Sequence, residues 1–311
     1  MKLPRLWMAV AALAFSAVGA NGAELTAEKK AEAEAFAANN AVSALYHEFG
    51  HLFVDQFELP VLGSEEDVAD AIATLMVMSE KSDAAVQVSL DTVDGYFMSS
   101  QIFEEDQSDD FGDGHGLDVQ RAYQMTCLLV GGDPDHFTDL ATEAGFDLER
   151  QERLCVEEFK SASRSWKQLT DGHRRLKPEG GAEIKVIYDD AGKEYAPIAE
   201  LLKREQVLEG VAAAINADFV LVRPATLRGT LCDEENAYYD EVIDEVSICY
   251  EYVQFFYDLF ADPENAGMDS AANKGAASSA EADVAAGPVI EGDDQVEGNS
   301  PQDRQQHTIN R

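Results

Sequence analysis

The chain has 311 residues, enough for one large domain or two modest ones, and 45% of them are hydrophobic, as in ordinary globular proteins. It carries 60 acidic residues against 23 basic ones, which gives a formal net charge of −37 at pH 7. A surface this acidic repels nucleic-acid phosphates and anionic membranes, so we exclude nucleic-acid binding as a function class.

Residues 1–23 have the pattern of a secretory signal peptide. Lys2 and Arg5 form a short basic start, residues 6–18 are mostly apolar, and residues 19–23 are mostly small. The alternative is an uncleaved membrane anchor, but the apolar run is shorter than the roughly 20 residues that a spanning helix needs. We therefore expect a cleaved signal peptide, a periplasmic or secreted mature protein, and no stable membrane anchor.

Apolar residues spaced three and four apart predict a mostly helical first part of the chain. The longest helix is expected over 26–56, where Val42, Leu45, Phe49, Leu52 and Phe53 share one face. Further helices are predicted at 64–79, 83–103, 117–129, 136–144 and 148–169.

After residue 178 the pattern changes to short β-rich runs. We expect strands at 183–188 and 219–223 around a helix at 198–215, then short strands or a hairpin at 226–232, 236–239 and 246–250, and a last helix at 250–260. The fold class is therefore predicted to be α+β. Residues 24–262 are expected to form one domain with a helical part, 24–176, and an α+β part, 183–262. Residues 263–311 have almost no large apolar side chain and are predicted to be a disordered acidic tail.

The four cysteines are expected to form disulfides if the chain is exported. They are Cys127, Cys155, Cys232 and Cys249, and none lies in a CxxC pattern, which argues against a cysteine-based zinc or redox site. Of the three possible pairings we favour the one between sequence neighbours, Cys127–Cys155 and Cys232–Cys249. Buried free thiols remain the alternative.

The segment HEFGH, residues 47–51, predicts a metal site. His47 and His51 are four residues apart on the predicted helix, so their imidazoles lie on one face and can share a Zn²⁺ ion. Glu48 lies between them, where its carboxylate can take a proton from an attacking water molecule. Two histidines and a glutamate in so apolar a helix would be costly unless they are paired or bind a metal.

A third ligand is expected just downstream, where the candidates are Glu65, Glu66, Asp67 and Asp70. We favour Glu66, because Asp70 then follows four residues later on the same helix face and can hydrogen-bond a ligand imidazole. Choosing Glu65 would place Ala69 at that supporting position. The alternative is that these acids are only a solvated helix N-terminus, favoured by the helix dipole.

HEFGH together with EDVAD, residues 66–70, resembles the HExxH…ExxxD pattern of gluzincin metallopeptidases. The resemblance implies one zinc ion per chain bound by His47, His51 and Glu66, with Glu48 as general base and Asp70 orienting a ligand. Residues 46–75 are still more similar to exported bacterial proteins that are catalogued as metallopeptidase-like and have no known function. That similarity continues through 115–127 and 232–251.

Two features depart from the gluzincin pattern. Only 14 residues separate His51 from Glu66, which requires a tight connection between the helices. The run Asn236-Ala237-Tyr238 resembles the edge strand on which gluzincins bind their peptide, but here it follows the metal-binding helix instead of preceding it. An edge strand can pair with an extended peptide wherever it lies in the chain. An ordinary hairpin is the equal alternative.

The resemblance predicts a zinc-dependent peptidase with peptide or protein substrates, and it predicts no oligomeric state. For the residue that stabilises the oxyanion we take His115 as first candidate, followed by Tyr238, Tyr239 and Arg121. The alternative function is a catalytically weak zinc-binding envelope or interaction protein. An open coordination position beside a cleft and an exposed strand would favour the enzyme.

Overall fold

The computed structural model describes residues 25–102, 116–176 and 183–262, and all of them belong to one compact unit. The predicted signal peptide, the predicted acidic tail and His115 lie outside the described residues. Within the described part of the chain, no helix is both long enough and apolar enough to cross a membrane.

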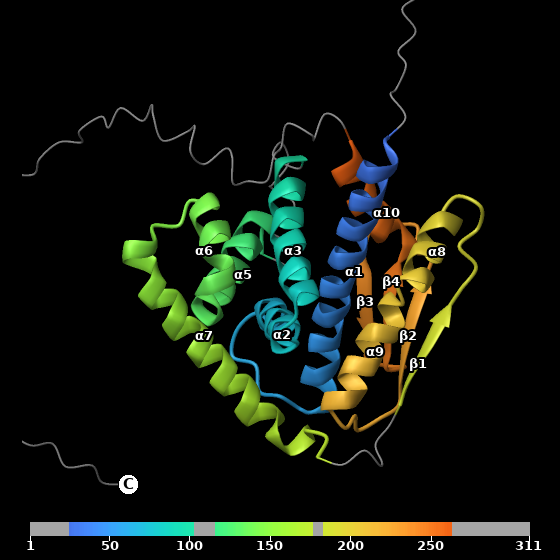
Figure 1. Ribbon diagram of the computed structural model, residues 1–311. Coiled ribbons are helices and arrows are strands. Elements are labelled where there is room, and N and C mark those ends of the chain that lie inside the picture. Colours follow the sequence, from blue (N-terminus) through green and yellow to red (C-terminus); the bar gives the residue numbers. More distant parts are fainter. Residues whose placement is uncertain (1–24, 103–115, 177–182, 263–311) are drawn as a thin grey trace, which may run out of the picture. The chain divides into compact units, whose positions relative to one another are not determined.

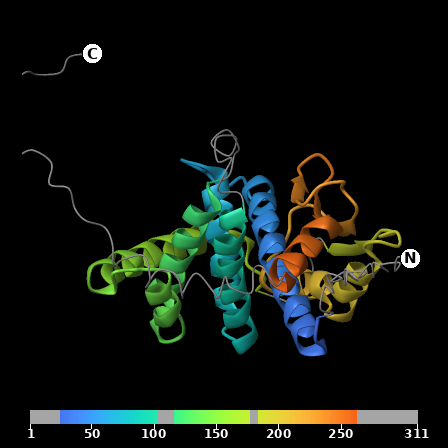
Figure 2. The same ribbon diagram turned by 90° about the horizontal axis from the view of Figure 1, so that it is seen from above.

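Helix α1, Ala27–Gln56, lies between the helices of the first part of the chain and the sheet with its later helices (Figures 1 and 2). It begins at Thr26, whose hydroxyl accepts a hydrogen bond from the backbone N–H of Lys29 at 3.2 Å. It ends before Glu58, which adopts a left-handed conformation with φ of 51°. Its aromatic side chains, Phe36, Tyr46, Phe49 and Phe53, are at most 2% exposed because other elements cover the helix on both sides.

The first part of the chain is helical, as predicted, and its later helices pack on one side of α1 (Figure 1). These helices are α2, Glu65–Ser79; α3, Asp83–Ile102; α5, Asp118–Gly132; α6, Pro134–Glu143; and α7, Leu148–Thr170, followed by the short 3-10 helix η1, Asp171–His173. The Cys127–Cys155 disulfide joins α5 to α7. A separate apolar cluster lies under α3, α5 and α6, around Val93, Phe97 and Leu129.

A four-stranded sheet covers the other side of α1. Its strands are β1, Ile184–Tyr188; β2, Ala225–Thr230; β3, Ala237–Asp240; and β4, Glu245–Cys249, in the order β1-β2-β4-β3. The pairs β1–β2 and β2–β4 are parallel, and β3–β4 is an antiparallel hairpin that leaves β3 at the edge. The predicted α+β class is thus confirmed.

The strands alternate buried and more exposed residues, which is the pattern of a sheet with one face on the core. Leu227 of β2 pairs with Val246 of β4, and both are fully buried against α1 and α9. On the opposite face, Arg228 of β2 binds Glu245 and Asp189 through its guanidinium group. A single core extends from α1 to both the helices and the sheet, so the predicted two parts share one hydrophobic interior.

The prediction of one helix over 198–215 is wrong. The structure has two helices, α8, Ala196–Arg204, and α9, Val207–Asp218. Gln206 between them has a φ of 53°, a left-handed conformation that ends the α-helical hydrogen-bond ladder. The last helix, α10, Tyr250–Ala261, lies where it was predicted.

The predicted strand at 219–223 is also not formed. Phe219 and Leu221 are buried, which explains the alternating pattern, but the segment joins no sheet and makes only isolated bridges. Its backbone is satisfied otherwise: the N–H groups of Val222 and Arg223 both donate to the side-chain oxygen of Gln56 on α1, at 3.1 Å. The Cys232–Cys249 disulfide ties the following loop to the end of β4.

Candidate metal centre

His47 and His51 project from the same face of α1 in its most deeply buried stretch. Their side chains are 6% and 15% exposed. The rings meet edge to face with centroids 4.9 Å apart, and their Nε2 atoms are 3.2 Å apart. Both rings therefore direct the same nitrogen toward one point.

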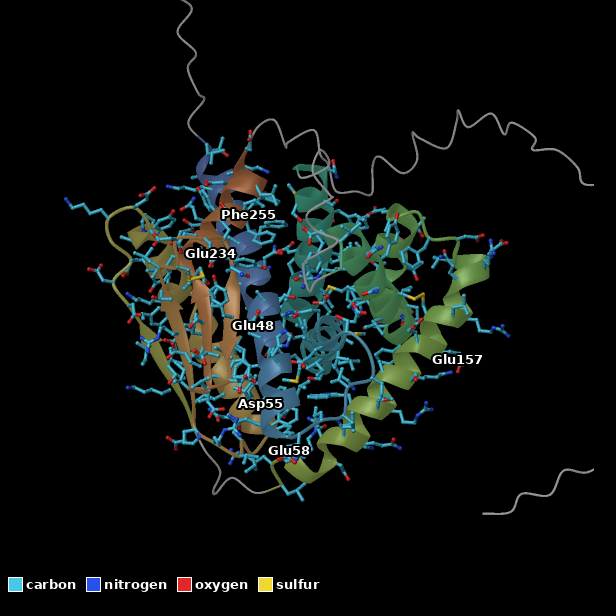
Figure 3. All side chains as sticks on the ribbon, turned by 180° about the vertical axis from the view of Figure 1, so that it is seen from behind. Glu48, Asp55, Glu58, Glu157, Glu234 and Phe255 are labelled. Atoms are coloured by element: carbon cyan, nitrogen blue, oxygen red, sulfur yellow. A yellow bond between two sulfur atoms is a disulfide. The ribbon has the colours of Figure 1, made fainter. Side chains whose placement is uncertain are left out.

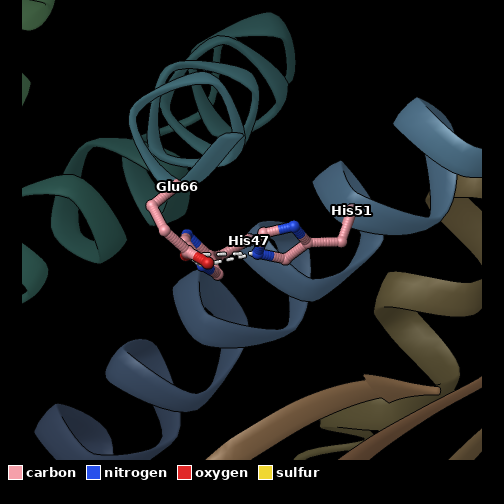
Figure 4. A group of neighbouring side chains, drawn as sticks. All are labelled: His47, His51 and Glu66. Carbon is pink, nitrogen blue, oxygen red and sulfur yellow. Dashed lines mark hydrogen bonds and ion pairs between the residues drawn. The ribbon is translucent and has the colours of Figure 1, made fainter. Parts of the chain in front are cut away.

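Glu66 completes a group of three donor atoms. It lies in the first turn of α2, and its Oε2 atom is 3.1 Å from Nε2 of His47 and 3.3 Å from Nε2 of His51. Figure 4 shows the carboxylate reaching from α2 to both rings on α1. These three residues form a group whose ligand atoms are close enough to hold one metal ion.

The spacing of these donors fits a tetrahedral metal. Bonds of about 2.0–2.1 Å to nitrogen and oxygen place neighbouring ligands of a tetrahedral Zn²⁺ roughly 3.3–3.4 Å apart. The three observed distances of 3.1, 3.2 and 3.3 Å are close to those edges. A second group of metal-ligand residue types, Cys232, Cys249 and Glu251, offers no thiolate because its sulfurs are bonded to each other.

The other nitrogen of each imidazole is held by a carboxylate. Nδ1 of His47 is 2.7 Å from Oδ1 of Asp70, and Nδ1 of His51 is 2.9 Å from Oε1 of Glu65. A carboxylate that accepts the Nδ1–H fixes the tautomer in which Nε2 carries the free lone pair. Both rings are thus prepared to bind a metal through Nε2.

The carboxylates raise the pKa of both histidines. Burial alone would lower the pKa of His51, but the hydrogen bonds that its ring donates to Glu66 and Glu65 and the charge of Glu48 raise it to about 9. Burial likewise opposes the charged form of His47, and the hydrogen bonds that its ring donates to Asp70 and Glu66 raise its pKa above 6.5. Without a metal, His51 is therefore protonated at neutral pH.

The close approach of α1 and α2 lets these groups meet. Gly50, between the two histidines, faces Ala69 of α2, and a Cβ atom on Gly50 would lie 2.9 Å from the Ala69 Cα atom. Two small residues at the crossing bring the backbones together without a clash. The short carboxylate of Asp70, next to Ala69, can then reach His47.

Glu48 borders a cavity of about 520 Å³ that opens beside the donor group. Glu48 is 8% exposed, and its charge acts on His51. Glu48 and Asp55 lie about two turns apart along α1 (Figure 3). The lining combines α1, the start of α2 and the edge strand: Glu48, His51, Val54, Asp55, Glu65, Glu66, Asn236, Ala237, Tyr238, Tyr239 and Glu241.

The edge strand β3 forms one wall of this cavity. Cys249 N–H donates to the carbonyl oxygen of Asn236, so the antiparallel alternation directs the backbone groups of Ala237 and Tyr239 away from β4. The Asn236 side chain accepts the N–H of Ala237 at 2.9 Å. Among the described strands none pairs with this edge.

Of the candidates for oxyanion stabilisation, Tyr238 and Tyr239 line the cavity beside Glu48, and Arg121 does not. The hydroxyl of Tyr238 donates to Glu234, and that of Tyr239 donates to Asp55 at 2.8 Å. Arg121 binds Asp70 with both its Nε and Nη2 atoms and lines a different cavity from the one beside Glu48. His115 lies outside the described residues.

Two contacts of the site were not predicted from the sequence. Glu65 was weighed as a third ligand and set aside for Glu66, with a place in the helix dipole as its remaining role, yet it binds Nδ1 of His51. Arg121 was considered only as an oxyanion donor, yet it binds Asp70 across 51 residues of chain. The position of Glu65 in the turn that faces His51 was the only available signal. Nothing in the local sequence links Arg121 to Asp70.

Comparison with known proteins agrees with this geometry. A search of curated proteins and a search of solved structures each find no match. A family model described as "Putative metallopeptidase" matches residues 9–170 and 188–283, which include His47, Glu48, His51 and Glu66. The match covers most of the chain, and the protein therefore belongs to this metallopeptidase family.

Proposed function

We propose that the protein is a zinc-dependent peptidase that hydrolyses peptide bonds in peptide or protein substrates. The observation that carries the proposal is the triangle of Nε2, Nε2 and Oε2 atoms from His47, His51 and Glu66, with sides of 3.1–3.3 Å. Membership of a metallopeptidase family suggests a metal-dependent hydrolase, and the triangle supplies the place for the metal.

Zinc suits this donor set better than the other common metals. Two imidazole nitrogens and one carboxylate oxygen are typical of catalytic zinc sites, whereas Ca²⁺ and Mg²⁺ prefer oxygen ligands alone. Zinc bound there would polarise a substrate carbonyl group and make a water molecule more acidic. A fourth position would face the cavity that Glu48 borders.

Glu48 is the residue that we assign to proton transfer. Its position next to His47 on α1 and in the cavity wall lets its carboxylate take a proton from the attacking water and deliver it to the leaving amine. Low exposure supports this role, because a buried carboxylate exchanges protons with few competing solvent molecules.

The substrate is proposed to bind as an added strand along β3. The carbonyl oxygen of Ala237 and the backbone groups of Tyr239 point away from β4 and can pair with an extended peptide, whereas the Ala237 N–H is held by the Asn236 side chain. Asn236 and Tyr238 flank them in the cavity wall, so Asn236, Ala237 and Tyr238 are the proposed substrate-binding residues. A cavity and an open strand edge beside the donor triangle favour an enzyme over a zinc-stabilised interaction protein.

For the oxyanion we retain His115 as the proposed donor. We also propose export, with a signal peptide at 1–23 and a periplasmic or secreted mature chain. The two disulfide pairs, Cys127–Cys155 and Cys232–Cys249, fit an oxidising compartment.

The test compares Glu48→Gln with the wild-type chain in peptide hydrolysis and in zinc content. Removal of the general base should lower kcat roughly 10²–10⁴-fold, while zinc content stays the same. A zinc chelator should abolish the wild-type activity, and added zinc should restore it. Wild-type turnover by Glu48→Gln would refute the mechanism.

A matched pair tests the ligands. Glu66→Gln should lose zinc, whereas Glu65→Gln, which removes a half-exposed partner of His51 Nδ1, should weaken zinc binding by roughly tenfold at most. Equal zinc affinity in the two variants would contradict the assignment of Glu66.

A further inference from the structure

Arg121 binds Asp70, the residue that contacts Nδ1 of His47. Its Nε donates to Oδ2 of Asp70 at 2.8 Å and its Nη2 donates to Oδ1 at 2.7 Å. The two side chains are 14% and 17% exposed. Two parallel hydrogen bonds from a planar guanidinium fix both the position and the plane of a carboxylate.

Arg121 is itself held from two helices. Its guanidinium lies over the ring of Tyr96 on α3, 4.5 Å from the ring centroid. Its Nη1 is 3.9 Å from Asp118, one turn earlier on α5, and Asp118 accepts the hydroxyl of Ser99 on α3. The guanidinium therefore has a defined orientation before it meets Asp70.

Asp70 connects Arg121 to the His47 ring. Oδ1 of Asp70 accepts hydrogen bonds from both Nη2 of Arg121 and Nδ1 of His47. Asp70 and Arg121 also line a cavity of about 600 Å³, which is separate from the cavity that Glu48 borders. Without the guanidinium, the carboxylate could rotate toward this space and release the His47 ring.

We propose that Arg121 is a positioning residue of the metal site, acting through Asp70 to hold His47 with Nε2 directed at the metal. The contacts form one chain from Tyr96 through Arg121 and Asp70 to His47. The inference depends on metal binding by the proposed ligands and not on peptide hydrolysis.

The first experiment measures the zinc dissociation constant by competition with a chromophoric chelator. Arg121→Gln should bind zinc roughly tenfold more weakly, because loss of an outer partner of a ligand typically costs 10–100-fold. Arg164→Gln, which removes an exposed arginine of α7, is the control and should leave the constant unchanged. Unchanged zinc affinity in folded Arg121→Gln would overturn the proposal.

A double variant separates positioning from general stability. If Arg121 acts through Asp70, Arg121→Gln should add less than about twofold to the effect of Asp70→Asn. Fully additive losses would show that Arg121 acts by another route and would overturn the proposal.

Arg121→Lys keeps the positive charge and the fold but cannot form both hydrogen bonds. With Co²⁺ in place of zinc, its visible absorption spectrum should differ from that of the wild type, because the spectrum reports the geometry of the ligands. A folded Arg121→Lys with the wild-type spectrum and wild-type zinc affinity would refute the inference. A chain that shows the predicted effects but cleaves no peptide would instead refute only the proposed function.

Discussion

His51 combines a proposed role as metal ligand with a raised pKa in one side chain. One of its nitrogens faces Glu66 and the other faces Glu65. The two carboxylates favour a protonated ring, and the pKa of His51 rises to about 9. Zinc requires the neutral ring, so proton and metal compete for the same nitrogen.

We therefore expect zinc affinity to fall as pH is lowered from 9 to 7, by about tenfold per unit for each proton displaced. Calorimetry in buffers of different ionisation enthalpy would measure the protons released. Glu65→Gln should reduce the release near pH 8, because one carboxylate that raises the pKa of His51 is removed. An affinity independent of pH over this range would contradict the assignment.

In the metal-free protein, the same raised pKa makes the fold less stable as pH rises, whereas zinc binding becomes stronger. Because the pKa of His51 is raised from 6.5 to about 9, protonated His51 stabilises the fold fully below pH 6.5. That contribution is lost as pH rises through about 9. Zinc therefore stabilises the protein most where the proton no longer does.

At the scale of helices, the crossing of α1 and α2 depends on Gly50. A methyl group there would meet the backbone of Ala69 at 2.9 Å, so the helices must separate by a few tenths of an ångström. Glu66 would then move away from both histidines. The donor triangle is thus sensitive to a residue that binds no metal.

Gly50→Ala should weaken zinc binding and destabilise the fold by about 1–3 kcal/mol, as overpacking typically does. Gly210→Ala on α9 is the matched control, since a Cβ there meets no atom within 4 Å. The control should leave zinc affinity unchanged and stabilise its helix by up to about 1 kcal/mol. Urea unfolding and zinc titration measure both effects, and equal zinc affinities would contradict this account.

The helices could be predicted from the sequence because their apolar spacing is local. HEFGH and Glu66 were recognisable for the same reason, since helical periodicity determines which side chains share a face. The break at Gln206 was missed because the apolar pattern continues through it, although the backbone turns left-handed there.

Contacts between distant segments could not be predicted in this way. The alternation of Phe219 and Leu221 indicates extended backbone but not its partner, which is the side chain of Gln56. The order of the strands and the contact of Arg121 with Asp70 depend on packing of the whole chain. Such pairings are set by tertiary structure, which a single sequence shows only weakly.

The whole molecule is strongly acidic, and the lining of the proposed active-site cavity is acidic as well. Asp55, Glu65 and Glu241 line the cavity in addition to Glu48 and Glu66, and no lysine or arginine belongs to its described lining. With a net charge of −37, the field at the cavity favours cationic peptides. A bound zinc ion would offset only part of this charge.

Peptides with lysine near the cleaved bond should therefore show a higher kcat/KM than the same peptides with glutamate. The ratio should shrink between about 0.01 M and 1 M salt, because the screening length falls from about 30 to 3 Å. Glu241→Gln should reduce the ratio, whereas Glu157→Gln on the exposed face of α7 should not (Figure 3). A ratio independent of salt would show that the field has no such role.

The edge strand is attached to the same helix that carries the histidines. The Tyr239 hydroxyl binds Asp55, one helical turn after His51, and Gln56 binds Asp244 in the hairpin turn. In the proposed complex, the distance between a bound peptide and the metal would be set by the rise of about 6 Å over four residues of α1. Inserting a single residue between His51 and Asp55 would rotate the strand attachment by about 100° around the helix axis. We therefore expect that the spacing of His51 and Asp55 along α1 cannot change without separating the proposed ligands from the strand.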